Sequence, residues 1–134
     1  MPGWIRFVIA FVVLCHGMAY LPYGLAPGQV VTEWKGVSQL FGGALTFDRT
    51  HVAVQVSFGS AVVALLACAL AIALAPLVPG WWRPLAVVGS VAGLAGFALF
   101  WDGQGQLLVQ EGVIGVARSL TLLIVAIAFP SVVR

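Results

Sequence analysis

Charged side chains are scarce in this sequence of 134 residues, which has six Lys and Arg and four Asp and Glu. Charged residues make up 7% of the chain and hydrophobic residues 62%, and the mean hydropathy is +1.11. A soluble domain needs a polar and largely charged exterior, and so few charged residues cannot provide one. The composition therefore excludes a soluble globular domain and indicates a membrane protein.

Basic runs, cysteine motifs and histidine clusters are also lacking. The formal net charge is only +2, which argues against nucleic acid as a partner. Cys15 and Cys68 lie in separate apolar runs and are expected to be packing residues, although a redox thiol pair is the alternative if the helices bring the sulfurs together. His16 and His51 have no ligand spacing, so we predict no metal site and no cofactor.

Long apolar runs are abundant, and Pro and Gly separate them at "LPYGLAPG", "PLVPGWWRP" and "WDGQGQ". About 20 apolar residues are needed for a helix to cross the hydrocarbon core. The sequence therefore predicts one all-α domain over 1–134, an integral membrane bundle of four transmembrane helices at about 4–24, 52–77, 83–101 and 107–129. Pro27 disfavours signal-peptide cleavage after the preceding small residues, so the first segment is expected to be retained as a helix.

The connection between the first two predicted spans, 25–51, is too long for a tight turn. Within "VVTEWKGVSQLFGGALTF" the apolar residues have helical spacing: Val31, Trp34, Val37, Leu40 and Phe41. We expect an amphipathic segment that lies at the membrane surface or covers the bundle. An ordered loop that only closes the chain is the alternative.

Basic residues in the short loops predict the orientation, because they favour the cytoplasmic side. Three fall on one side of the predicted membrane, Arg6, Arg83 and Arg134, and two on the other, Lys35 and Arg49. Both termini are therefore expected in the cytoplasm. Four tryptophans sit at predicted span ends, as in an aromatic belt: Trp4, Trp81, Trp82 and Trp101.

Small residues are expected to bring the helices together, because lipid offers little hydrophobic drive between them. They form stripes in three predicted spans: Gly59, Ser60 and Ala64, then Gly89, Gly93 and Gly96, then Gly112, Gly115 and Ser119. These stripes predict a compact bundle. The alternative is that some of these stripes form a dimer interface.

Arg118 interrupts the last apolar run, and an arginine near a helix centre costs about 2.5 to 3.5 kcal/mol on the insertion scale. Glu111 precedes it by two helical turns and lies on the same face. An ion pair or a shared water chain would compensate this cost, so we expect Arg118 to face the bundle interior as part of a polar site. The alternative is a structural arginine that binds carbonyl groups of neighbouring helices.

Other polar residues are expected to converge on the same outward-opening cavity. His16 and Tyr20 share a face of the first span, although a lone histidine is also common as a packing residue. The candidates for chemistry are Glu111, Arg118, Asp102 and His16, and those for ligand binding are Tyr20, Gln55, Gln110 and Trp101. The alternative is that the Asp and Gln residues are ordinary helix caps or loop residues.

The first span, "WIRFVIAFVVLCHGMAYLPYG", resembles the opening of DoxX-like membrane proteins, with His16, Gly17 and Leu21 matching. Tyr20 stands where that family often has lysine, and Gln55 where an acidic residue is common. The resemblance implies a small bacterial inner-membrane protein that is linked to redox or thiol metabolism and assists other enzymes.

Three functions are compatible with these features. The first is a non-enzymatic accessory subunit whose cavity holds a quinone or a lipid, in contact with membrane lipid and in a homo-oligomer or protein complex. The second is a membrane enzyme that acts by acid–base chemistry on a lipophilic small molecule. The third is a small proton-coupled transporter that protonates Glu111 or His16.

Overall fold

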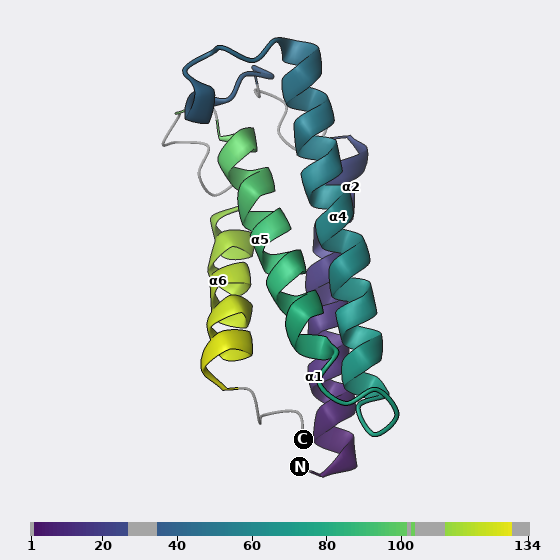
Figure 1. The fold of residues 1–134 in the computed structure, drawn as a ribbon. Coiled ribbons are helices and arrows are strands. Elements are labelled where there is room, and N and C mark those ends of the chain that lie inside the picture. Colours follow the sequence, from purple (N-terminus) through teal and green to yellow (C-terminus); the bar gives the residue numbers. More distant parts are fainter. Residues whose placement is uncertain (1, 27–34, 102, 104–111, 130–134) are drawn as a thin grey trace.

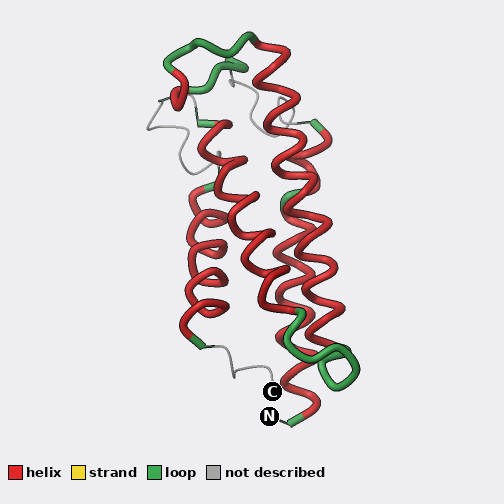
Figure 2. Tube along the Cα trace, viewed as in Figure 1, coloured by secondary structure: helices red, strands yellow, loops and turns green. Residues whose placement is uncertain are grey.

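The structure, a computed structural model, describes residues 2–26, 35–101, 103 and 112–129. In these ranges it is helical and contains no strand (Figures 1 and 2). The elements are α1 (Gly3–Ala19), α2 (Leu21–Leu25), the 3-10 turn η1 (Gln39–Phe41), α4 (Phe47–Ala73), α5 (Trp82–Phe100) and α6 (Val113–Ala128). The predicted all-α bundle is thus confirmed.

The long helices α1, α4, α5 and α6 run alternately up and down, so the start of α1 and the end of α6 lie at the same end of the bundle (Figure 1). Helix α4 packs between α1 and α5, and α6 packs against α5. The backbones of α1 and α6 scarcely contact each other. A seam therefore runs between the first and the last helix, and we call it the α1/α6 seam.

Three stretches of the described chain are long and apolar enough to cross a membrane: Gly3–Leu25, Phe47–Ala73 and Trp82–Phe100. Helix α6 has 16 residues and is therefore about 24 Å long. That length is a few ångströms below a typical hydrocarbon core, a mismatch that flanking side chains or a thinner bilayer can accommodate.

The boundaries of two spans differ from the prediction. Helix α4 begins at Phe47 instead of 52 and ends at Ala73. The Thr46 side chain caps this helix by accepting a hydrogen bond from the Arg49 N–H. The polar residues that follow Phe47, which the sequence assigned to a loop, therefore form the first turn of the helix. Helix α6 begins at Val113, and residues 107–111 of the predicted span lie outside the described part of the chain.

The first span is interrupted near its end, where the prediction had one helix. Helix α1 ends at Ala19 and the short α2 follows from Leu21. Pro22 lacks an N–H and its ring would collide with the Met18 carbonyl in a continuous helix, which accounts for the break. Tyr20, at the break, is buried among the other helices.

Glycines of α5 form the packing notches that the sequence indicated. A Cβ atom at Gly93 would lie 2.9 Å from the Tyr20 hydroxyl oxygen, and one at Gly96 would lie 2.9 Å from a Phe58 ring carbon. These distances are too short for a real contact, so only glycine admits the two rings. The α5 stripe is therefore used inside the bundle. Gly59 of α4, by contrast, has open space at its Cβ position.

The described part of the connection before α4, residues 35–46, forms a loop with the turn η1 at the upper end of the bundle (Figure 1). The Gln39 N–H donates to the Trp101 carbonyl at 3.0 Å, which ties the loop to the end of α5. Leu40 and Phe41 are exposed. The other half of the predicted amphipathic segment, with Val31 and Trp34, is outside the described residues.

The tryptophans follow the predicted belt with one exception. Trp4, Trp81 and Trp101 are exposed near helix ends. Trp82 is only 3% exposed, because its ring turns into the bundle at the start of α5.

Candidate functional site

Three buried polar side chains meet across the α1/α6 seam, and we call them the seam cluster: His16, Tyr20 and Ser119. His16 Nε2 lies 3.2 Å from Ser119 Oγ and 3.2 Å from the Tyr20 hydroxyl. The hydroxyl groups of Tyr20 and Ser119 are hydrogen-bonded to each other. The Tyr20 hydroxyl also lies 3.3 Å from the Gly115 carbonyl oxygen. Hydrogen bonds thus join α1 and α6 where their backbones hardly meet.

Local sequence explains how the cluster is placed. His16 and Tyr20 are four residues apart and therefore stack on one face at the end of α1, with ring centroids 4.9 Å apart. Gly93 leaves room for the Tyr20 ring, which packs at 5.6 Å from Phe58 and 5.5 Å from Phe97. The apolar side of Tyr20 thus belongs to the core and its hydroxyl faces α6.

One polar atom of the cluster stays unsatisfied. His16 Nδ1 is buried and has no hydrogen-bond partner among the described residues. A neutral imidazole has one N–H donor and one acceptor nitrogen. Nδ1 is therefore either a donor without an acceptor or an acceptor without a donor, depending on the tautomer. Ordered water or a ligand is the usual partner of such a group.

The seam cluster contains a Ser–His pair, which is a common arrangement for nucleophilic catalysis. Ser119 is fully buried and His16 is 6% exposed. Since no carboxylate of the described residues binds His16 Nδ1, the third member of a catalytic triad is missing there. In this conformation the cluster can bridge helices and bind, but Ser119 cannot reach a substrate.

Arg118 is exposed, so the expectation that it faces the bundle interior is wrong. It directly precedes Ser119, and successive residues of an α-helix are about 100° apart around the axis. Gly115 and Ser119 face the other helices, which turns Arg118 toward the outside of the seam. Its guanidinium still interacts electrostatically with His16 and Tyr20. Arg118 thus lies beside the seam cluster on its exposed side.

The other predicted site residues divide into two groups. Asp102, Gln110 and Glu111 lie outside the described residues. Gln55 Nε2 donates to the Leu25 carbonyl at 3.4 Å and so ties α4 to the end of α2. Trp101 caps the end of α5 and is 42% exposed. In the described part of the chain, neither of these two residues is hydrogen-bonded to the seam cluster.

Ser119 is the site residue that sequence reasoning missed, because it was assigned only to a small-residue packing stripe. The available signal was its place in the third stripe, which predicts close contact with another helix. A hydroxyl at such a contact needs a partner, and His16 and Tyr20 were the polar residues at matching depth.

The two thiols are free and differ in environment. Cys15 is exposed, whereas Cys68 is buried and donates from Sγ to the Trp82 carbonyl at 3.3 Å. Across the described ranges, no three His, Cys, Asp or Glu side chains gather as a metal site would require.

The predicted outward-opening cavity includes Glu111 and therefore stays a prediction. A groove of about 750 Å³ among the described residues lies toward the other end of the bundle and is lined by none of the predicted site residues. In comparisons with known proteins, no family model, curated protein or solved structure matches this chain.

Proposed function

We propose that this chain is a small multi-pass membrane protein that binds a lipophilic molecule, a quinone or a lipid, at the α1/α6 seam and acts as a non-enzymatic accessory subunit. One observation carries the proposal: exposed Arg118 adjoins the buried His16, Tyr20 and Ser119 at a seam where two helices scarcely touch. A charged side chain at this depth of an apolar helix marks a functional site by default.

The chemistry of the seam suits an amphiphile with a carbonyl or anionic group. Arg118 carries a guanidinium with five N–H donors, and its exposure gives access from the lipid side of the helix. Phe58 and Phe97 pack behind Tyr20 and fix the position of its hydroxyl group. A quinone carbonyl or a lipid ester accepts hydrogen bonds from such donors, and its ring or chain packs on the apolar helix faces.

The cellular setting belongs to the same proposal. The three helices long and apolar enough to cross a membrane support a bilayer setting, in which α6 would form the fourth span, and the basic residues favour both termini in the cytoplasm. The DoxX-like opening of α1 favours a bacterial inner membrane and a redox-linked partner complex. Acid–base catalysis and proton-coupled transport are less favoured, because His16 is nearly inaccessible to water.

A binding measurement tests the proposal. Purified protein in detergent is titrated with decylubiquinone and, separately, with a dispersed phospholipid. Arg118→Ala is compared with Arg49→Ala, which removes an exposed arginine from the start of α4. Because a hydrogen bond to a charged group contributes about 1.5 to 3 kcal/mol, Arg118→Ala should weaken binding about 10- to 160-fold.

The melting temperature of each variant serves as the folding control. Equal affinities for the two variants, or no binding of either lipophile by the unmodified protein, would show that the seam is not the binding site. Retention of quinone but not phospholipid would identify the class of ligand.

A further inference from the structure

A groove of about 750 Å³ opens at the end of the bundle where α1 and α5 begin and α6 ends. The residues that decide its chemistry are Arg6 of α1, Trp82, Arg83 and Val87 of α5, and Ala126 and Ile127 of α6. Arg6 and His16 are ten residues apart on α1, which is about 15 Å along the helix. The groove is therefore a site separate from the seam cluster and does not depend on the proposed function.

The groove is electropositive. Arg6 and Arg83 are charged, and none of the described residues that line the groove is acidic. Buried Arg6 Nε has no hydrogen-bond partner in the described part of the chain. Arg83 Nε donates to the Ala126 carbonyl at 3.0 Å, which leaves the terminal nitrogens of that guanidinium for another acceptor.

The first turn of α5 adds to this field. Trp82, Arg83 and Pro84 line the groove, and the first turn contains no acidic side chain. A helix N-terminus carries a partial positive charge that favours anions. The end of α6 contributes carbonyl groups of the opposite sign, and one of them, at Ala126, accepts a hydrogen bond from Arg83.

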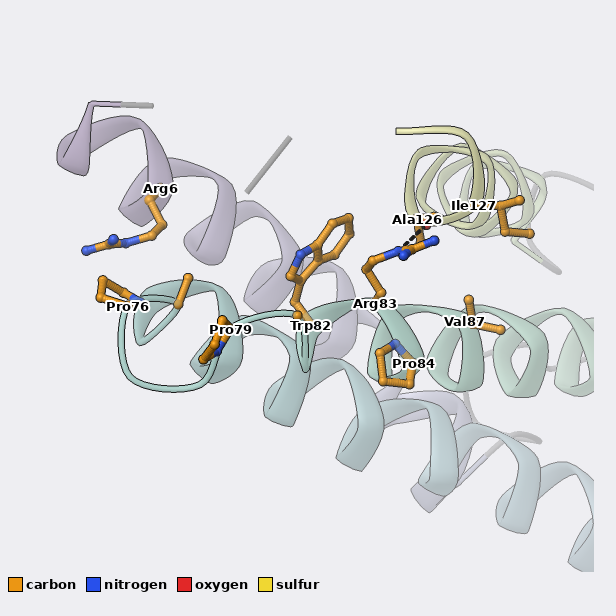
Figure 3. A pocket seen from close by; sticks show the side chains of 11 residues that line it. Arg6, Pro76, Pro79, Trp82, Arg83, Pro84, Val87, Ala126 and Ile127 are labelled. Carbon is orange, nitrogen blue, oxygen red and sulfur yellow. Dashed lines mark hydrogen bonds between the residues drawn. The ribbon is translucent and has the colours of Figure 1, made fainter. Parts of the chain in front are cut away.

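The two arginines do not converge on one point. Figure 3 shows Arg6 extending beside Pro76, Arg83 extending toward Ala126, and the Trp82 ring between them. A single small anion can therefore contact only one of the two guanidinium groups. A ligand that contacts both needs two anionic groups that are joined by a spacer.

The rest of the lining is apolar, with Val87, Ile127 and several prolines. The volume lies in the range that holds a whole organic ligand, and an isolated phosphate would leave most of it unfilled. Since the groove lies where helices end, it lies at the membrane interface of a spanning bundle. Basic pockets between transmembrane helices on the cytoplasmic side bind anionic lipid headgroups.

We propose that this groove binds a phospholipid with two phosphate groups, one at Arg6 and one at Arg83, with its glycerol spacer bridging the two arginines and its acyl chains on Val87 and Ile127. Each phosphate accepts charge-assisted hydrogen bonds from one guanidinium. The lipid thereby fills the space between α1 and α6 at this end of the bundle.

Native mass spectrometry tests the assignment. The protein is released from nanodiscs that contain either diphosphatidylglycerol, phosphatidylglycerol or phosphatidylcholine as the added lipid. The unmodified protein should retain diphosphatidylglycerol at least about tenfold better than either phosphatidylglycerol or phosphatidylcholine, the equivalent of one charge-assisted contact. Arg6→Gln and Arg83→Gln should each reduce retention to the phosphatidylglycerol level.

A control variant separates this site from the rest of the protein. Arg49→Gln, at the start of α4 and at the opposite end of the bundle, should retain diphosphatidylglycerol normally. Arg83→Gln also loses the bond to Ala126, so the decisive variant is Arg6→Gln, because Arg6 Nε has no hydrogen-bond partner in the described residues.

Three results would overturn the proposal. The first is equal retention of the one-phosphate and two-phosphate lipids. The second is an Arg6→Gln variant that retains lipid normally. The third is a rise in melting temperature with inorganic phosphate alone as large as the rise with diphosphatidylglycerol, which would identify a free-anion site instead.

Discussion

Ser119 Oγ on α6 lies 3.2 Å from His16 Nε2 on α1, although the two residues are 103 positions apart in the sequence. The backbones of these helices scarcely contact each other, so side-chain hydrogen bonds hold the seam. In a bilayer such interhelical hydrogen bonds contribute about 0.6 kcal/mol on average and about 1.7 kcal/mol at most. The direct contact between α1 and α6 therefore depends on a few polar atoms, whereas α5 packs along α6.

Ser119→Ala should lower the free energy of unfolding by about 0.6 to 1.7 kcal/mol, because it removes the hydroxyl that binds both His16 and Tyr20. Ser90 is an equally buried serine whose Oγ has no partner in the described part of the chain. Ser90→Ala should therefore change stability little. Unfolding of both variants in mixed micelles measures the difference, and equal losses would mean that the seam bonds do not contribute.

Tyr20→Phe keeps the ring in its notch and removes only the hydroxyl. Since this hydroxyl binds Ser119, the effects of Tyr20→Phe and Ser119→Ala should not add. In a double-mutant cycle we expect a coupling free energy of at least about 0.5 kcal/mol, as for residues of one hydrogen-bond network. Strict additivity of the two unfolding free energies would contradict the shared bond.

Gly93→Ala should destabilise the bundle by about 1 to 3 kcal/mol, because the new Cβ collides with a buried ring that has no room to move. The contact involved is the 2.9 Å approach to the Tyr20 hydroxyl oxygen. Gly59→Ala is the matched control, with no heavy atom within 4 Å of its new Cβ. That variant should gain up to about 1 kcal/mol from reduced backbone entropy. Melting temperatures that rank the two variants in the opposite order would refute the packing argument.

The fold was predictable because its determinants are local. Apolar run length sets the spans, and Pro and Gly mark their ends, so the expected spans overlap the observed helices closely. The start of α4 was misplaced because Asp48 and Arg49 suggest a loop, whereas the Thr46 cap makes them the first turn. Which ring fills which glycine notch, such as Tyr20 at Gly93, depends on helix registry and is not encoded in a local pattern.

The site was only partly predictable. His16 and Tyr20 share a helix face by spacing alone, and the structure joins them. The cost of a charge in lipid favoured an inward Arg118, but the small-residue stripe through Gly115 and Ser119 sets the rotation of α6. Close packing prevails because it acts along the whole helix, whereas a single arginine can extend its charge toward the surface. Asp102, Gln110 and Glu111 remain predictions.

Arg118→Leu should leave the free energy of unfolding unchanged or raise it, because the substitution removes no hydrogen bond between Arg118 and a buried group of the described residues. The arginine is exposed, and on the insertion scale arginine costs about 2.5 to 3.5 kcal/mol at a helix centre where leucine contributes about 0.3 to 0.6 kcal/mol favourably. Unfolding in mixed micelles and insertion into membranes both measure the change. Arg118→Lys serves as the control that keeps the charge. A loss of more than about 1 kcal/mol in the leucine variant alone would mean that Arg118 holds the bundle together, as in the structural alternative for this residue.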